Sequence, residues 1–213
     1  MFSHPVLVSS CLRLLVLLLF LEMPSLVSAA SRTPLNVIQS GTDRALQILH
    51  SCQPGKELGS LRGRKAEILQ IVDEYFNFTE MAKRALGRPW KDQTPDKQQE
   101  FVKLFKQLLF NTYVDRVSSY TCSDEKVVYD GEEIEGEYAL VKTRVLGYKN
   151  TDVNVDYRLR NEKGEWKVYD VVVEGISFIN NYRGQFNSIL AGESFDSLLA
   201  RLRERVAEQD KAS

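Results

Sequence analysis

Apolar residues in the first half of the chain recur with the period of amphipathic α-helices. They fall three and four positions apart, as in the stripe from Phe101 to Tyr113, and such residues share one side of a helix. Start signals precede the stripes, because a threonine cap stands before a proline at Thr33-Pro34 and Thr94-Pro95. Helices are therefore predicted over residues 34–49, 64–76, 78–86 and from 95 to at least 113.

Residues typical of helix ends and of loops set the bounds of the predicted helices more closely. Asn77 is predicted to cap the third helix, with Glu80 as its capping-box partner. Gly87 follows the last apolar residue and is expected to end that helix. Residues 52–63 hold one proline and three glycines, and this composition predicts a loop.

The hydrophobic period changes from 3.6 to 2 at Lys126. In the stretch Val155-Asp-Tyr157-Arg-Leu159, every second residue is apolar, as in a strand with one buried face. Gly175 ends this region, and a helical stripe returns from Phe178 to Leu190, followed by a last helix capped by Ser194. Four strands are predicted, over residues 127–129, 138–148, 154–160 and 166–174.

Four sequential strands joined by short turns predict an antiparallel meander with one solvated face. The predicted fold class is α+β, a helix-covered, four-stranded, curved antiparallel sheet in a single domain. On the last strand we expect the parity of Tyr169, Val171 and Val173 to face the helices.

The first 30 residues have the layout of a secretory signal peptide. Arg13 precedes a short apolar run from Leu14 to Leu21, and Glu22 and Pro24 then lead into the small residues 25–30. A membrane-spanning helix needs about 20 apolar residues, which this run does not supply. Residues 1–30 are predicted to be cleaved, after Ala29 or Ala30, leaving residues 31–213 as an exported domain.

The net charge and the cysteine content restrict the partners and the disulfide bonds to be considered. The net charge is −1 with interspersed signs, which argues against a nucleic-acid partner because such proteins present a basic face. Two cysteines remain after cleavage, Cys52 and Cys122. They either form a disulfide in the oxidising compartment or stay as two free thiols, and both alternatives remain open.

The sequence offers few residues for catalysis. One histidine, His50, follows the leader, and there is no HExxH, CxxC or P-loop motif, so no metal site, no cofactor and no enzymatic activity are expected. Asp170 stands out because it interrupts the apolar strand 168–173. It is interpreted as a structural acid that accepts hydrogen bonds; the alternative is a catalytic base with a raised pKa.

Three stretches of sequence resemble the MlaC family of periplasmic phospholipid carriers, also called toluene-tolerance auxiliary proteins. The most specific is Val168-Tyr-Asp-Val-Val-Val-Glu-Gly-Ile-Ser-Phe-Ile-Asn-Asn-Tyr-Arg-Gly-Gln-Phe186. Phe78-Thr-Glu-Met-Ala-Lys-Arg-Ala-Leu-Gly-Arg-Pro-Trp90 and Thr94-Pro-Asp-Lys-Gln-Gln-Glu-Phe-Val-Lys-Leu-Phe105 follow the family's order. The two cysteines and the insert at 55–63 depart from it.

The resemblance implies an NTF2-like curved sheet with an apolar cavity between sheet and helices. It implies a phospholipid ligand held by its two acyl chains, and two partners: an MCE-domain subunit of an inner-membrane ABC transporter and an outer-membrane lipoprotein complex. The implied location is the periplasm. The residues expected to line the lipid site are Phe105, Leu109, Tyr113, Val141, Val145, Tyr157, Leu159, Val171, Val173, Phe178, Tyr182 and Phe186.

Two other functions remain open at this point. An exported enzyme on an NTF2-like cone would use Asp170 as base and Tyr157 or Tyr169 as electrophile. A structural adaptor would instead have a filled interior, so an internal cavity of lipid size separates it from the carrier.

Overall fold

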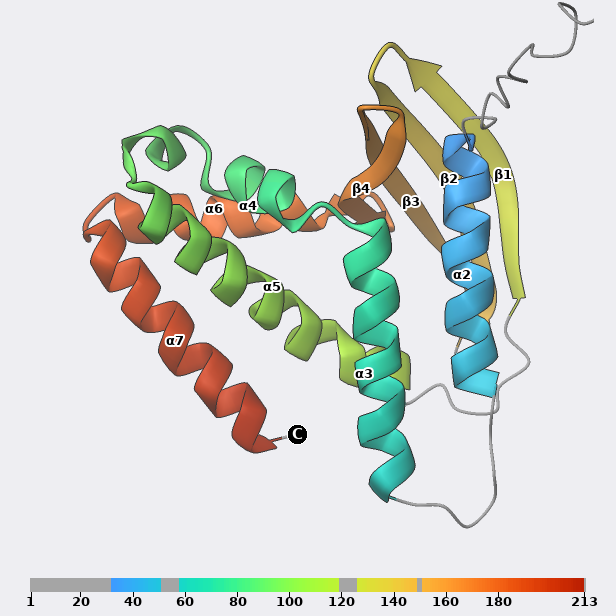
Figure 1. Ribbon diagram of the computed structural model, residues 1–213, viewed down its shortest axis with the longest axis horizontal. Helices are drawn as coiled ribbons and strands as arrows, with labels where there is room; N and C mark the ends of the chain where they lie inside the picture. The colour runs from blue at the N-terminus through green and yellow to red at the C-terminus, as the bar shows by residue number, and fades with distance from the viewer. Residues whose placement is uncertain (1–31, 51–57, 119–125, 149–150, 213) are drawn as a thin grey trace, which may run out of the picture. The chain divides into compact units, whose positions relative to one another are not determined.

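The computed structural model describes residues 32–50, 58–118, 126–148 and 151–212 (Figure 1). The leader, Cys52 and Cys122 lie outside these residues. The helices are α2 (Pro34–His50), α3 (Leu58–Tyr75), α4 (Phe78–Leu86), the short 3₁₀ helix η1 (Arg88–Asp92), α5 (Pro95–Ser118), α6 (Phe178–Leu190) and α7 (Phe195–Ala212). In this part of the chain no helix is long and apolar enough to span a membrane.

The helix predictions hold, with two local corrections. Helix α3 begins at Leu58, so the predicted loop over residues 52–63 is wrong in its second half. Asn77 caps α4 by accepting a hydrogen bond from the Glu80 backbone N–H at 2.9 Å. Glu80 does not complete the capping box: the Asn77 N–H donates to Val168 O, while the Glu80 carboxylate pairs with Arg84 at 2.8 Å.

The predicted antiparallel sheet is present and has five strands, not four. The strands are β1 (Lys126–Glu135), β2 (Tyr138–Tyr148), β3 (Thr151–Glu162), β4 (Glu165–Val173) and β5 (Ile176–Ser177), in the spatial order β1-β2-β3-β4-β5. Strand β1 was expected to end at Tyr129. It continues because the register shifts at a bulge between Tyr129 and Gly131, where Gly131 adopts φ 128°, a backbone conformation that glycine tolerates.

A second bulge changes which residues of β4 face the helices. Leu159 pairs with Val168, whereas Arg158 pairs with Asp170, so Tyr169 is the extra residue. Val168 and Val171 therefore share one face although they are three positions apart, and Val173 follows Val171 on that face. The parity predicted for Val171 and Val173 is correct, but Tyr169 leaves it and packs on Tyr138 and Arg84.

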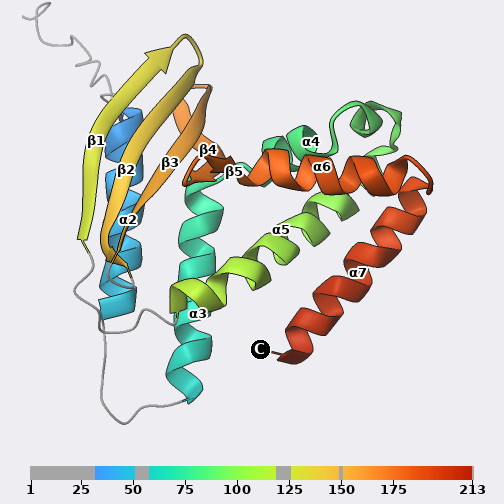
Figure 2. The same cartoon turned by 180° about the vertical axis from the view of Figure 1, so that it is seen from behind.

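The helices divide into two groups with separate hydrophobic cores. The sheet core joins α2 and α3 to one face of the sheet, where Val37, Tyr75 and Val141 are buried. Figure 2 looks onto the opposite face of the sheet, with α2 behind the strands. Gly41 of α2 faces the Tyr75 ring of α3, and a Cβ at Gly41 would lie 3.2 Å from that ring, so glycine lets the two helices approach closely.

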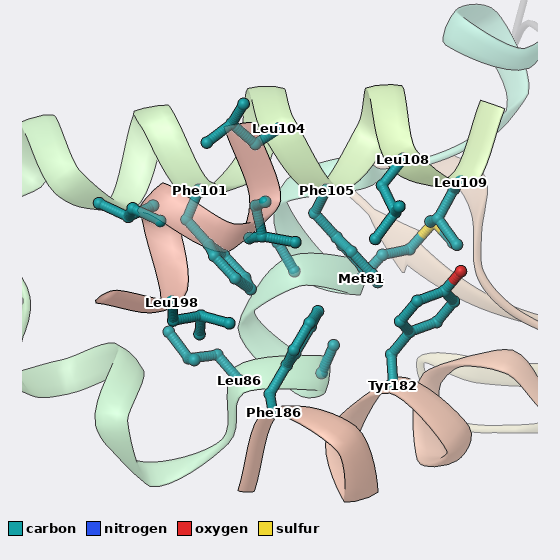
Figure 3. Packing of buried hydrophobic residues seen from close by; sticks show 14 of the residues in the cluster. Met81, Leu86, Phe101, Leu104, Phe105, Leu108, Leu109, Tyr182, Phe186 and Leu198 are labelled. Carbon is teal, nitrogen blue, oxygen red and sulfur yellow. The ribbon is translucent and has the colours of Figure 1, made fainter. Parts of the chain in front are cut away.

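The helical core consists of α4, α5, α6 and α7. Phe101 and Phe105 of α5 are fully buried and pack edge-on against Phe186 of α6, with centroid distances of 5.4 and 5.5 Å. Figure 3 shows the side chains of α5 pointing toward those of α6, with Met81 and Leu86 of α4 among them. The two aromatic stripes predicted from the sequence thus pack mainly on other helices.

Candidate functional site

An apolar cavity of about 230 Å³ lies where the two cores meet. It receives side chains from α3, α4, α5 and α6 and from strands β3 and β4, so the expected cavity between sheet and helices is present. The lining consists of aliphatic and aromatic residues: Ile68, Val72, Phe76, Phe78, Met81, Leu109, Phe110, Tyr113, Tyr157, Val171 and Phe178.

Helical spacing explains how α3 contributes to the wall. Ile68, Val72 and Phe76 are each four residues apart and therefore lie on one side of the helix. Tyr75, one position before Phe76, points to the sheet core instead. Phe76 packs against both cores, so it stands at the junction that the cavity occupies.

Two aromatic pairs hold neighbouring parts of the wall. Tyr113 of α5 stacks on Phe178 of α6, with centroids 4.3 Å apart and planes at 9°. Phe76 and Phe78, on either side of the Asn77 cap, stack at 6.1 Å. The helix cap and the short link between α3 and α4 therefore place two rings in the cavity wall.

The Tyr157 hydroxyl is a polar group in this apolar wall. Within the described parts of the chain, no hydrogen bond reaches it. Burial raises the pKa of Tyr157 to about 12, with a smaller contribution from Tyr129, because an apolar environment disfavours the phenolate. Tyr157 is therefore neutral at physiological pH and presents a hydroxyl without charge.

Charged residues lie beside the wall but outside it. The Lys106 ammonium on α5 binds the Asp73 carboxylate on α3 at 2.5 and 2.8 Å. The same ammonium lies 5.5 Å from the centroid of the Phe78 ring. This ion pair joins α3 to α5 next to the cavity.

A comparison with known protein families identifies the kind of protein. A model of the family described as "MlaC protein" matches residues 39–204, which is most of the chain and includes every residue of the cavity wall. The chain belongs to the MlaC family.

Two relatives with named functions agree with this membership. The MlaC-family chain is 24% identical over 139 residues to the intermembrane phospholipid transport system binding protein MlaC of Haemophilus influenzae, a match that covers 63% of this chain and 64% of that protein. It thus matches slightly less than two thirds of the Haemophilus protein's length. It is 25% identical over 222 residues to the toluene tolerance protein ttg2D of Pseudomonas putida, covering 96% and 95% of the two chains.

A solved structure shares the fold. It is the phospholipid-binding protein from Ralstonia solanacearum in complex with a phospholipid, which is 26% identical to this MlaC-family chain. The TM-score is 0.69, and the alignment covers 82% of this chain and 97% of the Ralstonia chain.

The structure distributes the twelve residues expected at the lipid site over three places. Leu109, Tyr113, Tyr157, Val171 and Phe178 line the cavity. Three aromatic residues lie in the helical core: Phe105, Tyr182 and Phe186. The other four lie on the sheet: Val141 and Leu159, which are buried in its core, and Val145 and Val173, which are partly buried. Contact of each with lipid stays a prediction.

Six wall residues were not among those expected at the site: Ile68, Val72, Phe76, Phe78, Met81 and Phe110. Ile68 and Val72 lie within the helix predicted over residues 64–76. The available signal was the four-residue spacing of the α3 stripe, which ends at the Asn77 cap. That spacing shows burial, but it does not show that the stripe meets a cavity.

Asp170 lies outside the cavity wall and has a full set of partners. Its carboxylate accepts hydrogen bonds from Arg158 at 2.9 Å, from the Ser177 hydroxyl at 2.6 Å and from the Ile179 backbone N–H at 3.1 Å. Tyr157 pairs with Val171, and Arg158 pairs with Asp170, so Asp170 and Tyr157 point to opposite faces of the sheet. These contacts correspond to the structural acid that we expected, and they tie β4 to the start of α6.

Proposed function

We propose that this protein binds a phospholipid by its two acyl chains and carries it between membranes. The observation that carries the proposal is the apolar cavity at the junction of the two cores, which a structural adaptor with a filled interior would lack. The Haemophilus relative is named for intermembrane phospholipid transport, and the Ralstonia structure contains a phospholipid.

The energetics of lipid transfer explain why such a cavity is needed. Each methylene buried from water contributes about 0.8 kcal/mol, so two chains with roughly 32 carbons would cost about 25 kcal/mol to place in water. A carrier must therefore enclose most of both tails. Aliphatic and aromatic walls meet this need without a charge inside the cavity.

The cavity must enlarge to accept a whole lipid. Its volume of about 230 Å³ is below the roughly 300–1,000 Å³ of sites for drug-sized ligands. Two packed cores are hard to compress, whereas the junction between them includes partly buried side chains such as Phe76, Tyr157 and Phe178. Loading is proposed to separate the α4–α7 group from the α2–α3–sheet group along this junction.

The location and partners follow from the same proposal. Residues 1–30 would direct export and be removed, leaving a carrier free in the periplasm. The docking partners would be an MCE-domain subunit of an inner-membrane ABC transporter and an outer-membrane lipoprotein complex. Because the sequence has no P-loop motif, the direction of transport would be imposed by the partners.

Lipid binding is tested on protein purified from its own host. Native mass spectrometry should show co-purified phospholipid, and delipidated protein should take up a phospholipid with a fluorescent acyl chain. Val171→Trp fills the cavity and should reduce uptake at least tenfold. Ile134→Trp is the matched control, since Ile134 is an exposed sheet residue, and should leave uptake unchanged. Lipid-free protein that also fails to take up the fluorescent lipid would refute the proposal.

A further inference from the structure

The apolar stripe of α3 that lines the cavity ends in a cation. The wall residues Ile68, Val72 and Phe76 are spaced by four, and the next position on this stripe toward the N-terminus is Arg64. Residues four apart lie one above the other on a helix. Arg64 therefore stands at the end of the cavity wall that is remote from α4.

Arg64 differs from an ordinary surface arginine in its surroundings. Its side chain is partly buried, and the Nε atom is inaccessible to solvent without a hydrogen-bond partner in the described parts of the chain. Buried donors normally have partners, and an unpaired one calls for a ligand, water or ion to complete it. The planar guanidinium suits phosphate, because two parallel N–H groups can donate to two oxygens.

The other cation described beside the wall is already neutralised. Lys106 lies near Phe78, at the α4 end of the cavity, and is bound to Asp73 at 2.5 Å. A phosphate placed there would have to displace a carboxylate, whereas one placed at Arg64 would meet a guanidinium with no ion pair among the described residues. The charges at the two ends of the cavity therefore favour the Arg64 end for an anionic group.

We propose that Arg64 binds the phosphate of the phospholipid, with the headgroup at the Arg64 end of α3 and the acyl chains directed toward Phe78 and Met81. This inference rests on the proposed function, since it assigns the orientation of the same ligand. The tails would then run along the stripe from Ile68 to Phe76. The Asp73–Lys106 pair would lie beside the tails and not beside the headgroup.

The test compares two ligands that differ only in the phosphate-containing headgroup. Delipidated protein is titrated with a phospholipid that has two eight-carbon chains, and with the diacylglycerol that has the same chains. Arg64→Gln should weaken phospholipid binding about tenfold, the size of a charge-assisted hydrogen bond, and leave diacylglycerol binding unchanged. Lys103→Gln removes an exposed charge from α5 and should change neither.

Further outcomes decide against the inference or against the proposed function. Arg64→Gln that binds the phospholipid as tightly as the wild type overturns the assignment of Arg64. Saturable binding of inorganic phosphate that needs Arg64, together with unchanged phospholipid binding, also overturns it and assigns Arg64 to free phosphate. Arg64→Lys keeps the positive charge but loses the two parallel N–H donors of the guanidinium, so it should lose less phospholipid affinity than Arg64→Gln. An equal or larger loss of affinity counts against the assignment of Arg64. Wild-type protein that binds neither ligand refutes the proposed function itself.

Discussion

Phe178, the first residue of α6, lies face to face with Tyr113 of α5, with 4.3 Å between the ring centroids. This stack joins two helices at the cavity, so both rings can contact an acyl chain. Phe178→Ala should lower phospholipid affinity about tenfold through lost apolar contact, as measured by fluorescent-lipid titration. Phe178→Leu keeps most of the apolar volume and should lose less. Unchanged affinity in the alanine variant would show that Phe178 is not part of the lipid site.

Two phenylalanines on α5 provide a matched comparison between core and cavity. Phe105 is fully buried in the helical core, whereas Phe110 lines the cavity and is only partly buried. Phe105→Ala should lower the free energy of unfolding by about 3–5 kcal/mol, because it leaves a void among packed rings. Phe110→Ala should cost clearly less in stability but weaken lipid uptake. Denaturant unfolding and lipid titration measure the two effects, and the opposite ranking of stabilities would contradict this division.

Asp170 is expected to stabilise the fold without acting in catalysis. Asp170→Ala leaves the Ser177 hydroxyl, the Ile179 N–H and Arg158 without their shared acceptor. The free energy of unfolding should fall by about 3 kcal/mol, as measured by denaturant unfolding. Asp196→Asn is the control, because Asp196 forms an exposed pair with Lys97 and should cost less than about 1 kcal/mol. A variant at Asp170 with wild-type stability but without turnover of a small apolar substrate would favour the enzyme.

The raised pKa of Tyr157 predicts a pH dependence of stability. The folded protein holds this proton up to about pH 12, whereas the unfolded chain releases it near pH 10. The stabilisation is therefore complete below pH 10 and is lost as the pH rises toward 12, by at most about 3 kcal/mol. Tyr157→Phe should flatten this part of the curve relative to the wild type in chemical unfolding from pH 9 to 12. Parallel curves would show that Tyr157 does not titrate differently in the two states.

The sequence predicted the elements well because their signals are local. Asn77 and Gly87 bound α4 as expected, and the alternation of Val155, Tyr157 and Leu159 identified β3. The bulges were not predicted because each depends on the neighbouring strand. In the sequence alone, Gly131 is typical of a strand end, and only its pairing with β2 shows that the strand continues. Glu80 was assigned to the cap from spacing alone, but its carboxylate instead pairs with Arg84 and Arg160.

The cavity wall was harder to predict than the fold, for a physical reason. Periodicity shows that a residue is buried but does not show what buries it. Phe105 and Leu109 occupy the same stripe of α5, yet Phe105 packs on the rings of α6 while Leu109 reaches the cavity. The difference depends on which elements pack beside each residue, and this is set by contacts between elements far apart in the sequence.

The position of the cavity between two cores has a consequence for the lifetime of the protein. At the cavity, the wall residues face empty space, so direct packing between the α4–α7 group and the α2–α3–sheet group is interrupted there. A ligand that binds only the folded state adds stability in proportion to the logarithm of its concentration relative to Kd, and here it would add contacts across the junction at the cavity. The empty protein should therefore open locally and be cut by proteases sooner than the loaded one. Cargo would then protect its own carrier, and the supply of lipid would set how much carrier survives.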